Sequence, residues 1–318
     1  MAVAKVSLPL GFLNENDLQV ESSMTSSMSN SLLTPELMAK LERLELVSRK
    51  IFRGGLKGER RSKRKGESVE FADYRNYVSG DDLRFIDWNL YARLDRLYLK
   101  LFQEEEDLHF YCLIDASPSM AAGQPSKIES ARQLAAALGF IGLCRADRVK
   151  IDTLAGLKNS PPLRGRSSLS RMLDLLNQIE PEERSNLLEG VKTFALRNRG
   201  KGVIVLITDL MDKSGYEAAL RMLVANQMDI YLIHLLSPEE LQPTLMGDLR
   251  LIDCEDQDEV EISISPAVLK RYKQTLENFL HQAKQFCSRR AINYLLMPSD
   301  RAVDLMVTQY LCQRGLVR

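Results

Sequence analysis

Acidic and hydroxyl side chains alternate directly after an apolar stretch in the middle of the chain. Asp115, Ser117 and Ser119 follow the run Leu108–Ile114, and a further aspartate, Asp209, follows a second apolar run. Hard cations such as Mg²⁺ take about six oxygen ligands, supplied by carboxylates, hydroxyls and water. An Asp-x-Ser-x-Ser loop can direct one carboxylate and two hydroxyls into one space, and a carboxylate from a neighbouring strand can join them.

The same residue types also have a purely structural use. Serine and aspartate at strand ends are common as turn residues and helix caps, so Ser117 or Ser119 could cap the segment that follows. The Thr208-Asp209 pair favours the metal interpretation, because it places another carboxylate at the end of a second strand. We therefore expect a site for Mg²⁺, or for Mn²⁺ or Ca²⁺.

A parallel sheet is needed to bring these residues together. Short apolar runs alternate with helical stretches along the chain, which is typical of an α/β fold with a doubly wound, mainly parallel sheet and helices on both faces. Ligands of such a sheet bind beyond the carboxyl ends of its strands. The expected strands are Leu97–Gln103, Leu108–Ile114, Val149–Leu154, Ser160–Leu163, Val203–Ile207, Ile230–Leu236 and Ile292–Met297, with a hairpin at Leu249–Asp253 and Val260–Ile264. The expected helices are Lys127–Ala146, Ser168–Ile179, Ser185–Arg197, Tyr216–Asn226, Pro266–Ser288 and Asp300–Gln313.

The segments before the sheet have a different composition. Residues 1–33 are poor in charge and rich in serine, which predicts a disordered extension. Thr34 is a candidate N-cap with a proline after it, so we expect a helix over 35–50. The predicted division is the extension, an N-terminal α+β appendage over 34–106, and the sheet domain over 107–318.

Composition limits the possible functions. The chain has 43 basic and 43 acidic residues, so it is not built as a nucleic-acid binder as a whole. Basic residues gather in 53–65, where an acidic partner or nucleic acid is the alternative function. The five cysteines are scattered without CxxC spacing, which favours a reducing compartment over a zinc site. No apolar run approaches the roughly 20 residues that span a bilayer, so we expect a cytoplasmic protein.

The loop motif resembles the metal-ion-dependent adhesion site of von Willebrand factor A domains. The stretch Asp115-x-Ser117-x-Ser119-Met120 carries this resemblance. Those domains add an aspartate in a Thr-Asp-Gly sequence after a central strand, and Asp209 matches it, with leucine in place of the glycine. The resemblance implies a von Willebrand factor A-like fold and a bound divalent ion.

These domains also supply a threonine ligand from a later loop. Ser185, just before the helix that precedes the second apolar run, fits this position with serine in place of threonine. Ser167 or Ser168, after Gly165, is the competing choice.

A charged and aromatic segment upstream is similar to the signature of a bacterial family called domain of unknown function 58. The matching residues are Gly66, Glu70-Phe71, Arg75, Tyr77, Gly80-Asp81-Asp82, Arg84, Ile86-Asp87-Trp88 and Ala92-Arg93. The first part departs from the family's Gly-x-Glu-Phe spacing, since three residues separate Gly66 from Glu70. The match runs from about residue 35 to the C-terminus.

The family resemblance implies a non-enzymatic protein-binding module. Family members are thought to act with MoxR-type AAA+ ATPases in protein assembly, maturation or stress responses. In the adhesion-site mechanism, a carboxylate from the partner completes the metal shell, so the implied partner is a protein, either such an ATPase or its client.

The upstream signature has two interpretations. Its charged residues can form an arginine–aspartate network that fastens the segment, with the tryptophan packed, or they can form a second partner surface. The residues in question are Arg75, Asp81, Asp82, Arg84, Asp87, Trp88 and Arg93.

A Mg²⁺-dependent phosphohydrolase with Asp115 as nucleophile is the competing enzymatic hypothesis. This chemistry needs a second carboxylate in the loop and a lysine to neutralise phosphate. The loop has Ser117 where the acid would help, and the nearest lysine is Lys127, at the start of the following helix.

Overall fold

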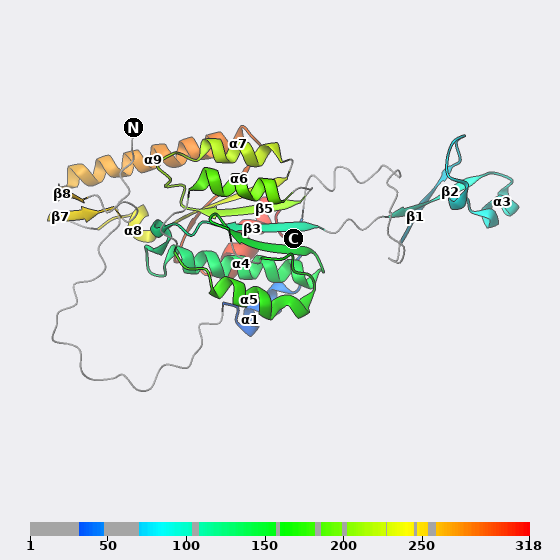
Figure 1. Ribbon diagram of the computed structural model, residues 1–318, viewed down its shortest axis with the longest axis horizontal. Coiled ribbons are helices and arrows are strands. Elements are labelled where there is room, and N and C mark those ends of the chain that lie inside the picture. Colours follow the sequence, from blue (N-terminus) through cyan, green and yellow to red (C-terminus); the bar gives the residue numbers. More distant parts are fainter. Residues whose placement is uncertain are drawn as a thin grey trace. The chain divides into compact units, whose positions relative to one another are not determined.

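Figure 1 shows the computed structural model of the chain. The structure describes residues 32–47, 70–103, 108–156, 160–181, 186–198, 202–226, 228–244, 247–253 and 259–318. They form two compact units, one with residues 32–47 and the described residues from 108 onward, the other with residues 70–103. The predicted extension up to residue 31, the basic run 53–65 and Ser185 lie outside the described residues.

The larger unit is built on a parallel sheet of five strands in the order β4-β3-β5-β6-β9. Its strands are β3 (His109–Ile114), β4 (Arg148–Thr153), β5 (Val203–Thr208), β6 (Asp229–Leu236) and β9 (Asn293–Pro298). Every residue of β5 and β6 is buried, because helices cover both faces of the sheet. The predicted doubly wound α/β fold is confirmed.

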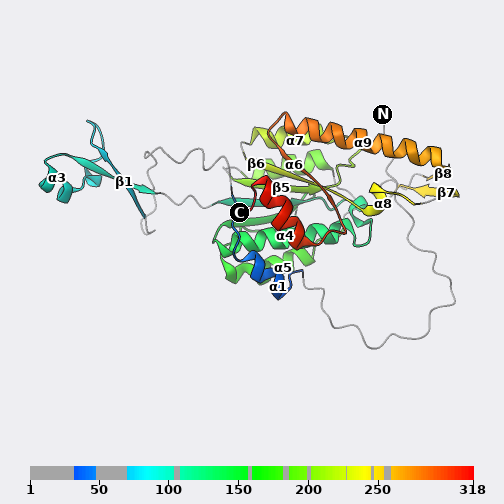
Figure 2. The same ribbon diagram turned by 180° about the vertical axis from the view of Figure 1, so that it is seen from behind.

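The helices divide between the two faces of this sheet, as Figures 1 and 2 show. On one face lie α1 (Pro35–Leu41), α4 (Lys127–Cys144) and α5 (Leu169–Asn177). On the other lie α6 (Leu187–Arg197), α7 (Glu217–Ala225) and the long α9 (Pro266–Ser288). Residues from this second set of helices pack with β3, β5 and β6 in one core cluster that includes Phe194, Leu220 and Phe286.

The remaining elements are short. A one-turn helix, α8 (Pro238–Leu241), follows β6 and leads to the hairpin of β7 (Gly247–Ile252) and β8 (Glu259–Ile264). The predicted terminal helix is broken into α10 (Val303–Leu305), a π-helical turn (Met306–Leu311) and α11 (Cys312–Arg314). The predicted strand near Ser160 is reduced to a single bridge between Val149 and Leu163.

The N-terminal segment differs from its prediction. Helix α1 ends at Leu41 instead of near residue 50, and Leu46 then pairs with Val317 in an antiparallel bridge. Leu41 and Leu46 are buried, so the chain leaves the helix to cover the sheet unit with both side chains. The predicted appendage over 34–106 is therefore wrong at its start, since residues 34–47 belong to the larger unit.

The smaller unit is a two-stranded antiparallel ribbon with helical turns. Strand β1 (Glu70–Asn76) pairs with β2 (Tyr98–Gln103), and a 3₁₀ turn (Leu83–Phe85) and α3 (Trp88–Leu94) connect them. In the described parts of both units, no helix is long and apolar enough to cross a membrane.

Candidate metal site

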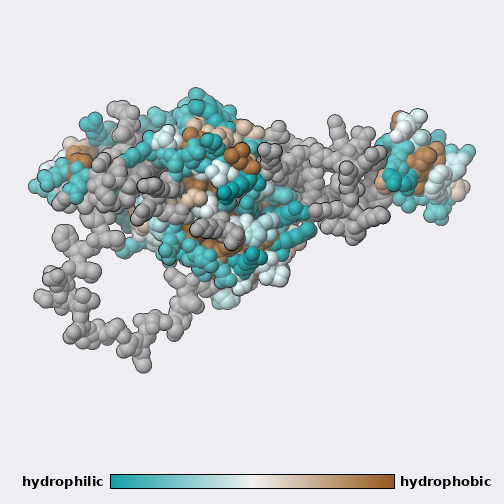
Figure 3. Space-filling view, in the orientation of Figure 1, coloured by the Kyte–Doolittle hydropathy of each residue, from teal (hydrophilic) through white to brown (hydrophobic). Residues whose placement is uncertain are grey.

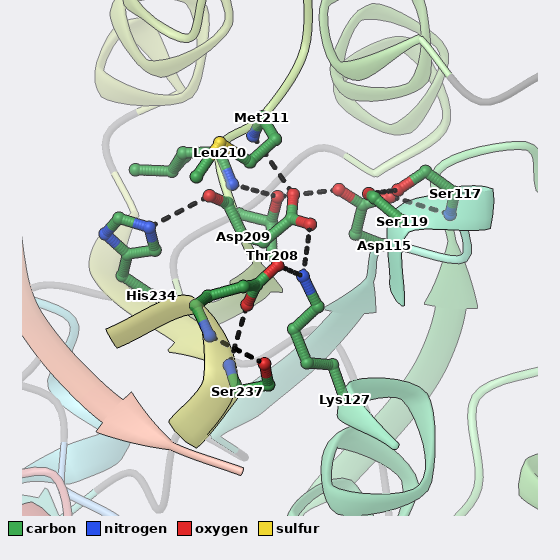
Figure 4. Close-up of polar contacts among 11 residues, drawn as sticks. Asp115, Ser117, Ser119, Lys127, Thr208, Asp209, Leu210, Met211, His234 and Ser237 are labelled. Carbon is green, nitrogen blue, oxygen red and sulfur yellow. Dashed lines mark hydrogen bonds and ion pairs between the residues drawn. The ribbon is translucent and has the colours of Figure 1, made fainter. Parts of the chain in front are cut away.

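Two aspartates meet at the carboxyl edge of the sheet. Asp115 follows β3 and Asp209 follows β5, and these strands are neighbours in register, with Ile114 opposite Ile207. The backbone N–H of Asp115 donates to the carbonyl of Ile207 at 2.9 Å, which extends the ladder to the aspartate. Both aspartates are buried. The strands thus hold two carboxylates side by side, away from bulk water, as Figure 4 shows.

The serine hydroxyls turn toward these carboxylates. The backbone N–H of Ser117 donates to Asp115 Oδ1 at 2.9 Å, which fixes the turn after β3. Ser117 Oγ and Ser119 Oγ lie 3.0 Å apart, and the Ser119 side chain also hydrogen-bonds to Asp209. The structure therefore brings together four of the five predicted ligands, Asp115, Ser117, Ser119 and Asp209.

Thr208 joins the cluster, although the sequence did not assign it a role of its own. Its Oγ1 donates to Asp115 Oδ2 at 2.6 Å and accepts from the backbone N–H of Leu210 at 3.0 Å. Thr208 therefore braces the Asp115 carboxylate from the neighbouring strand. Its position directly before Asp209 was the available signal.

A buried lysine and a third carboxylate complete the site. Lys127 Nζ lies 2.9 Å from Asp209 Oδ2 and 2.5 Å from Glu240 Oε1. Glu240 lies in α8, where Ser237 and Glu240 form a reciprocal capping box. Sequence reasoning considered Lys127 only as a phosphate-binding lysine and missed Glu240. The Ser-x-x-Glu spacing after a strand was the signal for it.

The surroundings of the two aspartates shift their pKa values in opposite directions. Burial and the charge of Asp209 raise the pKa of Asp115 to about 6. Burial would also raise the pKa of Asp209, but the charge and hydrogen bond of Lys127 outweigh it and lower that pKa. The pKa of Asp115 is thus raised, and a cation beside it would favour its ionised form.

His234 contacts the backbone of the site at Asp209. One ring nitrogen lies 2.9 Å from the carbonyl oxygen of Asp209 and the other 2.8 Å from the hydroxyl of Tyr294. Burial lowers the pKa of His234 to about 4. The ring therefore stays neutral near pH 7 and fixes the backbone of Asp209.

The fifth predicted ligand is not settled among the described residues, because Ser185 lies outside them. The alternative ligands, Ser167 and Ser168, lie away from the site. Ser168 Oγ donates to the carbonyl of Arg164 at 2.8 Å, and the preceding Leu163 pairs with Val149 near the start of β4. Ser167 and Ser168 therefore follow the amino end of that strand, opposite the site.

The start of α6 is tied to the loop after Asp209. The N–H of Leu187 donates to Asp212 Oδ2 at 2.8 Å, and the side chain of Asn186 caps the helix. The described residues next to Ser185 thus belong to the carboxyl edge of the sheet.

The donor set fits a hard cation. Among the described residues, the candidate ligands are the carboxylates of Asp115 and Asp209 and the hydroxyls of Ser117 and Ser119. Oxygen ligands with few formal charges suit Mg²⁺, which keeps several waters when it binds to proteins.

In the smaller unit, most of the predicted partner-binding residues bond to each other. Arg75 forms a bidentate pair with Asp81 at 2.8 Å. Arg84 likewise pairs with the neighbouring Asp82. These pairs support the interpretation that the charged residues fasten the segment.

Asp87 connects the strands of this unit to α3. It caps α3, accepts from Tyr74 Oη at 2.9 Å, and pairs with Lys100 at 3.1 Å. The hydrogen bond from Tyr74 is the main reason why the pKa of Asp87 falls to about 2.

Trp88 differs from its predicted packing. Its side chain is 61% exposed and contacts Tyr91 edge-to-face, with ring centroids 6.2 Å apart. Arg93 is exposed as well. Other exposed apolar residues of this unit are Val78, Leu83, Phe85 and Leu94, and Figure 3 shows hydrophobic residues gathered there.

The fold and site define an α/β protein with a polar, cation-compatible cluster at the carboxyl edge of its sheet. The model of the family described as "Protein of unknown function DUF58" matches residues 73–282. The chain belongs to this family.

Relatives and solved structures extend the comparison. The chain is 26% identical over 250 residues to "Uncharacterized protein Mb1516" of Mycobacterium bovis and to "Uncharacterized protein Rv1480" of Mycobacterium tuberculosis, covering 76% of this chain and 78% of each relative. An aerotolerance-related membrane protein from Bacteroides fragilis is 16% identical, with a TM-score of 0.43 over 66% of this chain and 98% of that one. The pilus adhesin SpaC from Lactobacillus rhamnosus GG is 9% identical, with a TM-score of 0.39 over 68% of this chain and 32% of that one.

Proposed function

We propose that this protein is a non-enzymatic, metal-dependent protein-binding module of the von Willebrand factor A type. The observation that carries the proposal is the convergence of Asp115, Ser117, Ser119 and Asp209 at one edge of the sheet. These side chains, with Ser185 as the proposed fifth ligand, would hold Mg²⁺, Mn²⁺ or Ca²⁺. The ion would supply a bond to a carboxylate of the partner.

The chain's own residues prepare such a site for binding. Thr208 and the turn at Ser117 fix both oxygens of Asp115, and Lys127 and the N–H of Met211 fix those of Asp209. Because these carboxylates are already oriented, little conformational entropy is lost when a cation binds. The partner that we propose is a MoxR-type AAA+ ATPase or one of its clients.

The phosphohydrolase alternative has less support. A lysine that neutralises phosphate must face the substrate, yet Lys127 is fully buried and bonded to both Asp209 and Glu240. No second carboxylate lies in the loop beside Ser117. Hydrolysis of a generic phosphate ester that is lost in Asp115→Asn would favour this alternative over our proposal.

A pull-down tests the proposal directly. Tagged full-length wild type, Asp115→Ala and Asp229→Ala would each be presented to lysate of the native host in Mg²⁺ and in EDTA. Asp229 is a matched control, since it is a buried aspartate at the amino end of β6. We expect an ATPase or client retained by wild type and Asp229→Ala in Mg²⁺ alone. Equal retention under all conditions would contradict metal-dependent binding.

A further inference from the structure

The most unusual group in the candidate site is the side chain of Lys127. It is fully buried, and burying an ammonium group is costly unless it is paired and hydrogen-bonded. It reaches the site from the first turn of α4, whose N-cap is Ser126. The fold thus places one fixed positive charge next to Asp209, a proposed metal ligand.

The ammonium group of Lys127 pairs with one of the proposed metal ligands. Lys127 Nζ contacts Asp209 Oδ2 at 2.9 Å, whereas Asp209 Oδ1 accepts from the N–H of Met211 at 3.0 Å. Both oxygens of Asp209 therefore have donors without a divalent ion. The Asp115 carboxylate accepts from the backbone N–H of Ser117 and from Thr208 Oγ1.

Glu240 keeps the ammonium in place. Its Oε1 contacts Lys127, and its Oε2 accepts from the N–H of Ser237 at 2.7 Å. Tyr272 of α9 donates through its hydroxyl to the backbone carbonyl of Glu240 at 2.8 Å. The lysine is therefore held from both sides, by β5 through Asp209 and by α8 through Glu240, as Figure 4 shows in part.

We propose that Lys127 is a resident counter-cation of the metal site. It keeps Asp209 oriented when no divalent ion is bound, and it competes with that ion for the negative charge of Asp209. The competition with the ion rests on the proposed function, whereas the orientation of Asp209 in the metal-free protein does not. Lys127 is a positioning residue and does not itself contact the ion.

The test compares Mg²⁺ affinity in full-length wild type, Lys127→Met and Lys150→Met by titration calorimetry. Lys150 is a matched control, because it is a largely buried lysine of β4 that pairs with Asn198 and Asp152 away from Asp209. We expect Lys127→Met to bind Mg²⁺ at least about tenfold more tightly than wild type, since a unit charge close to the ion is removed. Lys150→Met should match wild type.

Urea unfolding in EDTA, followed by circular dichroism, tests the apo role. Lys127→Met should be less stable than wild type in EDTA, and saturating Mg²⁺ should restore more stability to it than to wild type. If Lys127→Met does not fold, the double variant Lys127→Met/Glu240→Gln removes the unpaired carboxylate and should still bind Mg²⁺ more tightly than wild type.

The outcomes separate the two proposals. Equal or weaker Mg²⁺ binding by the folded variants, with normal binding by wild type, overturns the counter-cation role and leaves the proposed function intact. Binding by Lys127→Met alone supports the counter-cation and contradicts metal-dependent function in the wild type. Absence of binding in every variant refutes the proposed function and the competition with the ion, whereas wild-type stability of Lys127→Met in EDTA overturns the role of Lys127 in the metal-free protein.

Discussion

Replacing Asp115 with asparagine should change how the stability of the metal-free protein depends on pH. Asp115 is buried beside Asp209, and its pKa rises from the ordinary 3.8 to about 6. Asparagine has nearly the same shape but carries no charge at any pH. The comparison therefore isolates the cost of ionising this one carboxyl.

The sign follows from proton binding in the two states. Between pH 3.8 and about 6, the folded protein holds a proton on Asp115 that the unfolded chain has released. The stability contributed by this group therefore falls as the pH rises through that window and is constant above it. At about 1.4 kcal/mol per pKa unit, the shift corresponds to about 3 kcal/mol.

The assay is urea unfolding in EDTA, followed by circular dichroism, from about pH 4 to about pH 8. The difference in unfolding free energy, Asp115→Asn minus wild type, should increase by about 3 kcal/mol up to about pH 6 and then level off. Subtraction removes the opposite trend of carboxyls in the other unit with lowered pKa values, such as Asp87. A difference that stays constant with pH would refute the proposed proximity of two charged, buried carboxylates.

Three further predictions concern the hydroxyl ligands, the exposed aromatic surface and the sheet. Ser117→Ala should weaken Mg²⁺ binding about tenfold or more in calorimetry while folding normally, because its backbone N–H still holds Asp115; unchanged affinity would remove Ser117 from the ligand set. Trp88 is the only tryptophan of the chain, so its fluorescence should shift to the blue when a captured partner binds. Trp88→Ala should weaken that binding. An unshifted spectrum would place the interface elsewhere. Gly202→Ala should destabilise the protein by about 1–3 kcal/mol in urea unfolding, since the new Cβ would lie 2.2 Å from the carbonyl oxygen of His109. Wild-type stability of this variant would show that the backbones at Gly202 and His109 can move apart.

Much of the fold could be predicted because it depends on patterns within short segments. The strands of the main sheet match continuous apolar runs, and α9 follows its predicted bounds. The predictions are wrong where contacts between segments distant in the sequence determine the structure. Helix α1 stops early because Leu46 pairs with Val317 at the other end of the chain, and no local pattern signals that contact.

The candidate site shows the same limit. Asp115, Ser117, Ser119 and Asp209 could be predicted because strand ends in a parallel sheet share one edge. The partnership of Lys127, Asp209 and Glu240 joins residues up to 113 positions apart, and each of these residues alone reads as an ordinary helix or strand terminus. The network interpretation of the upstream signature has Trp88 packed, but its side chain is exposed.

The most direct test of the metal site is a Mg²⁺ titration by calorimetry at neutral pH, with wild type, Asp115→Asn and the control Asp229→Asn. The proposed site predicts a single binding event in wild type and in Asp229→Asn, and its loss in Asp115→Asn. Identical binding by all three proteins would show that the metal, if it binds, does not use the carboxyl edge of β3, and would contradict the proposed function.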